Sequence, residues 1–69
     1  MWMVIHMTKS LSAAELLRDR LTAEGFLIRL RPVSHSADAQ EAYYELLVPR
    51  AEAEEARRVL FDQNLFEIS

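Results

Sequence analysis

The chain has 69 residues, of which 51% are hydrophobic and 28% are charged, and it contains no cysteine. This composition is that of a single folded domain, 1–69, rather than a disordered chain, and the absence of cysteine excludes a disulfide framework and a thiolate metal site. The formal net charge is −3 and the sequence has no basic run, which disfavours a general binder of nucleic acid or of anionic membranes.

The apolar opening, residues 1–7, is too short for a signal peptide or a membrane span, so we expect a cytoplasmic protein. A core of this size supplies little net stability, and no disulfide can add to it. Association with another chain is the expected supplement, so we predict a homodimer or a protein partner.

The first half of the chain predicts a strand followed by a helix. Residues 2–7 (WMVIHM) are apolar and β-branched, which favours a buried strand. Ser12 followed by Glu15 predicts a capping box at the start of a helix over residues 12–24, with Ala14, Leu17 and Leu21 on its inner stripe. Gly25, the only glycine, follows where a helix needs a left-handed C-terminal residue.

The next segments predict two strands separated by a loop. Residues 26–31 (FLIRLR) alternate in polarity as a strand does, and Pro32 is expected to end it. Residues 33–41 are polar and are interpreted as a flexible loop. Residues 43–48 (YYELLV) form the third predicted strand, and Pro49 is expected to end it.

The C-terminal third predicts a second helix over residues 50–63, opened by Pro49, with small alanines on the side that meets the sheet. Asn64 is a suitable terminator, and residues 65–69 are expected to form a short fourth strand or a tail. The order predicts an α+β, ferredoxin-like β-α-β-β-α(-β) two-layer sandwich, with two helices on one face of an antiparallel sheet. The third strand is expected between the first two, because it contains no proline.

Two stretches, AAELLRDRLTAEGFLIRL (residues 13–30) and YELLVPRAEAEEARRVL (residues 44–60), carry a family resemblance. They resemble a family of small prokaryotic proteins described as signal-transducing, whose domain has no known function. The resemblance implies a small bacterial α+β domain with a regulatory or interaction role, and it supplies no catalytic residue.

Chemistry-bearing residues are few. Ser34, His35, Ser36 and Asp38 are neighbours in the predicted loop, whereas a catalytic triad needs rigid positioning from separate segments. The two histidines, His6 and His35, lack the spacing of metal ligands. We expect no catalytic, metal or cofactor-binding site, and no enzymatic activity.

The sheet face away from the helices is the candidate interface, because the predicted pattern leaves apolar and aromatic side chains on it. Leu27 and Leu47 are expected to be uncovered there whichever side the first strand presents. If Trp2, Val4 and His6 face this way rather than Met3, Ile5 and Met7, the interface set is Trp2, Val4, His6, Leu27, Arg29, Arg31, Tyr43, Glu45 and Leu47.

Three functions remain open. The first is a non-enzymatic interaction or regulatory module, a homo-oligomer that pairs through this face or through the free edge of the first strand. The second is a small-metabolite sensor of the ACT type, although the turn Thr8–Lys9–Ser10 lacks the usual glycine. The third is an RNA-binding sheet, which aromatics beside arginines favour and the negative net charge disfavours.

Overall fold

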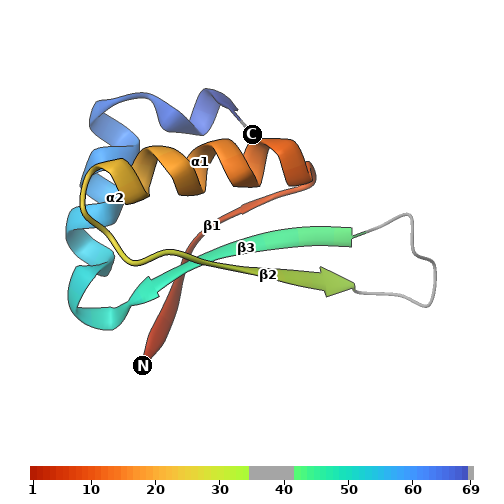
Figure 1. The fold of residues 1–69 in the computed structure, drawn as a ribbon, viewed down its shortest axis with the longest axis horizontal. Coiled ribbons are helices and arrows are strands. Elements are labelled where there is room, and N and C mark those ends of the chain that lie inside the picture. The colour runs from red at the N-terminus through yellow and green to blue at the C-terminus, as the bar shows by residue number, and fades with distance from the viewer. Residues whose placement is uncertain (35–41, 69) are drawn as a thin grey trace.

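The computed structural model describes residues 1–34 and 42–68 and confirms a small α+β domain. The elements are β1 (Trp2–Thr8), α1 (Leu11–Ala23), β2 (Arg29–Ser34), β3 (Ala42–Pro49), the 3₁₀ turn η2 (Arg50–Glu52), α2 (Ala53–Asp62) and the 3₁₀ turn η3 (Leu65–Ile68). Both helices lie on one side of a three-stranded antiparallel sheet, and neither covers the other side (Figure 1). Within the described ranges, no helix is long and apolar enough to cross a membrane.

The strand order is β1-β3-β2, with β3 in the centre as predicted. Only three strands are present in the described part of the chain, so the ferredoxin-like order is not confirmed. Of the two alternatives for this end of the chain, a fourth strand or a tail, the fourth strand is wrong for residues 65–68, because they form η3 in the helical layer. Asn64, with a φ of 53°, starts this turn, and its carbonyl oxygen accepts a hydrogen bond from the amide of Glu67 at 3.2 Å.

A β-bulge interrupts the pairing of β1 with β3. Val4 pairs with Leu47 and His6 pairs with Leu46, so Ile5 is an extra residue on β1. A bulge changes which side chains point to each face beyond it. Met3 and Ile5 pack into the core, whereas Met7, paired with Glu45, faces away from the helices.

The second strand lies three residues later than predicted and continues through Pro32 to Ser34. Pro32 pairs with Tyr44 inside the sheet, so the expectation that it ends the strand is wrong. Because β2 is an edge strand, the missing amide of a proline can be tolerated there. The loop predicted over residues 33–41 is shorter at its start, since Val33 and Ser34 belong to β2; residues 35–41 lie outside the described part.

Both ends of α1 are closed by hydrogen bonds. The cap is Ser10, not Ser12, because the Oγ of Ser10 accepts from the amide of Ala13 at 3.2 Å. At the other end Gly25 has a φ of 100°, its amide donates to Thr22 O at 3.0 Å, and the amide of Phe26 donates to Leu21 O at 3.1 Å. This pair of bonds is a Schellman motif, as the glycine predicted.

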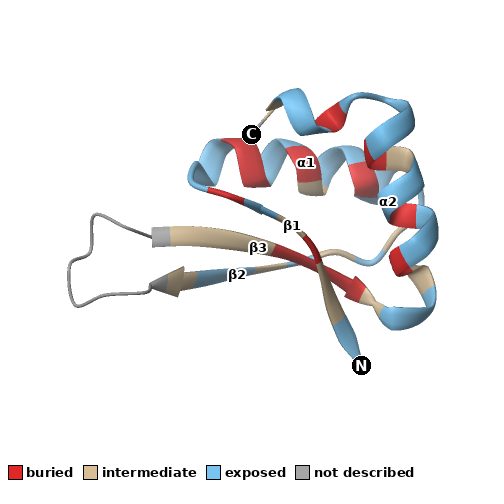
Figure 2. Cartoon of the chain, turned by 180° about the vertical axis from the view of Figure 1, so that it is seen from behind, coloured by how far each residue is buried: buried red, intermediate tan, exposed pale blue. Residues whose placement is uncertain are grey.

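The core fills the space between the sheet and the helices. Its fully buried side chains come from the stripes predicted for both helices and from β3: Ala14, Leu17, Leu21, Leu46, Val48, Ala56 and Leu60. Figure 2 shows buried segments, in red, along α1, α2 and the second half of β3. η3 contributes Leu65, so the C-terminal turn completes the core instead of extending the sheet.

The two serines at the start of α1 give a direct test of the cap. Ser10→Ala removes the acceptor of an orphan helix amide and should lower the free energy of unfolding by about 1 kcal/mol. Ser12→Ala should change it by less than about 0.5 kcal/mol, because Ser12 is inside the helix, exposed, and bonded only through Ser10 Oγ at 2.9 Å. Urea unfolding of both variants measures the difference, and a larger loss in Ser12→Ala would contradict the assignment.

Candidate interaction surface

The sheet face away from the helices, called the open face below, is built from three cross-strand rows. Residues that pair directly across strands share a face of the sheet. The residues paired with the core residues Leu46 and Val48 lie on the helix side, so the rows between them lie on the open face. The rows are Val4–Leu47–Arg29, Met7–Glu45–Arg31 and Tyr43–Val33, with Trp2 at one end. The structure therefore brings together seven of the nine predicted interface residues: Trp2, Val4, Arg29, Arg31, Tyr43, Glu45 and Leu47.

Leu47 is on this face but is not uncovered. Its exposed fraction is only 3%, although it does not belong to the core between sheet and helices. It occupies the central strand between Val4 and Arg29, and these neighbours, with Trp2 beside them, leave it almost no contact with solvent. The expectation that Leu47 is exposed is wrong, because long side chains on the flanking strands can cover a residue on a central strand.

Leu27 lies outside the sheet. It is 63% exposed in the connection between α1 and β2, where its amide donates to the Oε1 of Glu52 at 3.0 Å. The alternation in FLIRLR predicted a strand from residue 26, but the pairing of β2 with β3 begins only at Arg29. Leu27 is therefore not part of the open face.

His6 is on the helix side, because the bulge at Ile5 reverses the expected alternation. It pairs with the core residue Leu46, and its ring meets the ring of Phe66 edge to face, with centroids 5.3 Å apart. Burial lowers the pKa of His6 below 6.5, since desolvation disfavours the charged imidazolium. The residue that replaces it on the open face is Met7, 41% exposed, which the sequence offered only as part of the alternative set with Met3 and Ile5.

Cations and aromatic rings are paired on the open face. The Arg29 guanidinium lies over the Trp2 ring, 5.2 Å from its centroid, and the Lys9 ammonium lies 5.6 Å from the centroid of Tyr43. Arg31 donates from Nε to the Oε1 of Glu45 at 2.7 Å. Each cation thus has a neighbour on the face, and because the cations themselves are exposed, these contacts contribute little to net stability.

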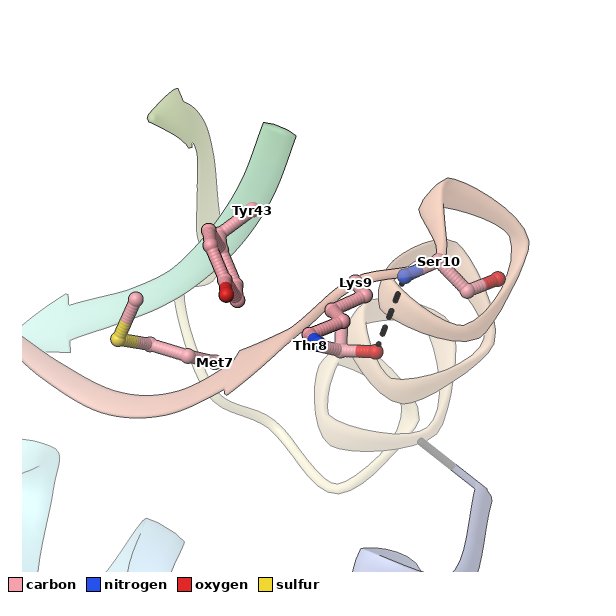
Figure 3. Close-up of a pocket in the computed structure, with 5 residues that line it drawn as sticks. All are labelled: Met7, Thr8, Lys9, Ser10 and Tyr43. Carbon is pink, nitrogen blue, oxygen red and sulfur yellow. Dashed lines mark hydrogen bonds between the residues drawn. The ribbon is translucent and has the colours of Figure 1, made fainter. Parts of the chain in front are cut away.

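Two hollows flank the Arg31–Glu45 pair. The larger, of about 400 Å³, is open to solvent and lies between Met7 of β1, Tyr43 at the start of β3, and the turn that leads into α1 (Figure 3). In this turn the Thr8 hydroxyl accepts from the Ser10 amide at 3.3 Å. The smaller, of about 300 Å³, is lined by Trp2, Val4, Leu30, Pro32, Leu47 and the two arginines.

The described residues form no cluster of metal ligands. Over residues 1–34 and 42–68, no three histidine or acidic side chains approach closely enough to hold a metal ion. The predicted loop residues His35, Ser36 and Asp38 lie outside this part, so the prediction that they carry no catalytic role stays a prediction. Ser34 pairs with Ala42 in the sheet.

Comparisons with known proteins give no relative. No family model matches the chain, and no curated protein or solved structure is significantly similar to it. The resemblance to the signal-transducing family stays a prediction, and the open face must be interpreted from its own geometry.

Leu27 and Leu47, which were both expected to be exposed, should respond differently to truncation. Leu47→Ala removes a buried side chain and should cost about 2–5 kcal/mol of unfolding free energy. Leu27→Ala should cost less than about 0.5 kcal/mol, because Leu27 is 63% exposed. Chemical denaturation measures both, and equal costs would show that Leu47 is not covered.

The position of His6 predicts a pH dependence of stability. Because the pKa of His6 in the folded chain lies below the unfolded value of 6.5, the unfolded state binds the proton more readily. The contribution of the neutral His6 ring to the free energy of unfolding is therefore complete above the unfolded pKa and is lost as the pH falls below it. In His6→Gln this contribution is absent.

The measurement is urea unfolding of the wild type and of His6→Gln from about pH 8 to about pH 5. The wild type should lose more stability than the variant across this range. His35 and the carboxylates are common to both proteins, so their titration cancels in the comparison. Parallel curves would place His6 in solvent.

Proposed function

We propose that this chain is a non-enzymatic protein-interaction module of a regulatory or signal-transducing kind, and that the open face is its binding surface. One observation carries the proposal: apolar side chains and anchored cations lie side by side on a sheet face that no described helix covers. Trp2 and Met7 are 40% and 41% exposed there, in β1, whose backbone is held by its pairing with β3. A rigid surface of this kind loses little conformational entropy on binding.

The face is favoured over the strand edges. The edge of β1 is interrupted by the bulge, and the Arg57 side chain donates to the Val4 carbonyl oxygen at 3.4 Å. The edge of β2 contains Pro32, between exposed arginines and Val33. Bulges, prolines and charges are the features that keep edge strands from pairing with another chain.

A small-ligand sensor is the second candidate, and the larger hollow favours it. The hollow holds about 400 Å³, is lined by Met7 and the Tyr43 ring, and has the Lys9 ammonium beside it. This combination suits a small apolar molecule that carries an anionic group. A thermal-shift screen against metabolites separates this candidate from the first, because a ligand selective for the folded state raises the melting temperature.

We also propose that the fold is a three-stranded version of the ferredoxin-like sandwich, in a cytoplasmic protein. Support comes from the central position of β3, with β1 and β2 antiparallel to it on either side. The helix between β1 and β2 makes them a split β-α-β unit.

Site-specific cross-linking tests the interaction module. A photoreactive phenylalanine analogue at position 7, on the open face, should give discrete protein adducts in the cells that produce the chain. The same analogue at position 16, on the outer side of α1, is the control, because Leu16 is also exposed, at 57%. Equal labelling at both positions, or none at position 7, would contradict the proposal.

The mass of the adduct also tests the homo-oligomer. A cross-link between two copies doubles the mass of the chain, and sedimentation velocity of the purified protein then has to show a dimer. An adduct with a different protein would assign the open face to a hetero-partner.

A further inference from the structure

We infer that the partner of the open face is an acidic segment of another protein, with apolar side chains between its carboxylates. This inference rests on the proposed function and names the partner class.

The acidic residues lie mainly in the helical layer of the molecule, which also carries Arg18, Arg20, Arg50, Arg57 and Arg58. In the described part of the chain, Glu45 is the only acidic residue in a strand, and the others lie on the helices, the 3₁₀ turns and their flanks. The open face carries Arg29, Arg31 and, at its border, Lys9. An excess of cations thus lies on one face of a chain with a net charge of −3.

The way Arg29 is held leaves it free to bind an anion. Stacking over the Trp2 ring, at 5.2 Å, uses the flat face of the guanidinium and not its N–H groups. These N–H groups form a planar fork that matches a carboxylate in a bidentate pair. The stacked side chain has already lost part of its rotamer freedom, so less entropy is lost when the carboxylate binds.

The apolar part of the surface indicates what accompanies the carboxylates. Trp2, Val4 and Arg29 line the smaller hollow beside Leu47, and Met7 lines the larger one. An apolar side chain of the partner can enter either hollow, while a neighbouring acidic residue meets Arg29 or Lys9. Because the hollows and the cations lie side by side, we expect acidic and apolar residues to alternate in the partner segment.

A second copy of the chain fits this face poorly. Two open faces brought together would oppose arginines and lysines with arginines and lysines, and the one glutamate on each is already paired with Arg31. Pairing an open face with the acidic helical layer of another copy is a head-to-tail contact, which continues into rings or filaments.

Nucleic acid also fits less well than an acidic peptide. Trp2 pairs with Pro49 at one end of β3, and Tyr43 lies at the other end. Six residues of strand separate their positions by about 20 Å, so the two rings form no continuous stacking platform. Both rings already have a cation over them.

The test is a selection from a random dodecapeptide display library against the immobilised 69-residue chain, followed by titration of a selected peptide. Enriched peptides should contain Asp or Glu interleaved with apolar residues and should shift amide resonances of the open face. Binding should weaken with salt, as exposed charge pairs do. Replacing the acidic residues of the peptide by Gln and Asn should abolish it.

Two matched variants locate the contact. Arg29→Gln should weaken binding at least about tenfold, because a charge-assisted hydrogen bond is lost, and Arg29→Lys should fall between it and the wild type. Arg58→Gln makes the same change in net charge on α2 and should weaken binding less than about twofold. Melting temperatures of all three establish that they remain folded.

Each other outcome has one meaning. Peptides without acidic residues that still perturb the open face would overturn the acidic partner and leave the interaction module standing. No enrichment, or binding elsewhere on the molecule, would overturn both. A uridine oligonucleotide that competes with the peptide at equal affinity, or a wild-type chain that sediments as a dimer closed over this face, would also overturn the acidic partner.

Discussion

The bulge at Ile5 is the constraint on which the two faces of this sheet depend. One extra residue in β1 lets Met3 and Ile5 pack inward and still presents Met7 outward, because the register against β3 shifts by one position between Val4 and His6. Without it, strict alternation would direct Met7 into the core and His6 to solvent. The bulge thus places His6 against η3 and Met7 at the larger hollow.

The helical layer depends on this same strand. β1 contacts both helices, and η3 follows α2 to place Phe66 against His6 and Leu65 in the core. Small residues on the inner sides of the helices, such as Ala14 and Ala56, are fully buried and let the backbones approach the sheet. A hydrogen-bond chain from Arg20 through Gln63 to Glu24 ties the ends of α1 and α2 together, with distances of 2.9 and 2.6 Å.

On the open face, the same groups serve folding and recognition. Trp2 and Arg29 help to cover Leu47, so the hydrophobic residue in the centre of β3 is protected without a second layer of helices. The aromatic–cation pairs therefore stabilise a face that also stays available to a partner. This dual role explains how a sheet with one uncovered side can carry a buried leucine on it.

The sequence by itself determined the local features. Gly25 marked the end of α1, the Ala and Leu stripes identified the buried sides of both helices, and the proline-free run YYELLV identified the central strand. These follow from backbone conformation and hydrophobic periodicity, which depend on residues close together in the chain.

Only the tertiary structure decided the composition of the candidate surface. The bulge depends on how β1 pairs with β3, residues that lie about 40 positions apart, and no local pattern in WMVIHM announces it. The start of β2 at Arg29 and its passage through Pro32 depend on its being an edge strand. Burial of Leu47 depends on long side chains from both neighbouring strands. In each case a contact between distant segments outweighed the local preference of the residues.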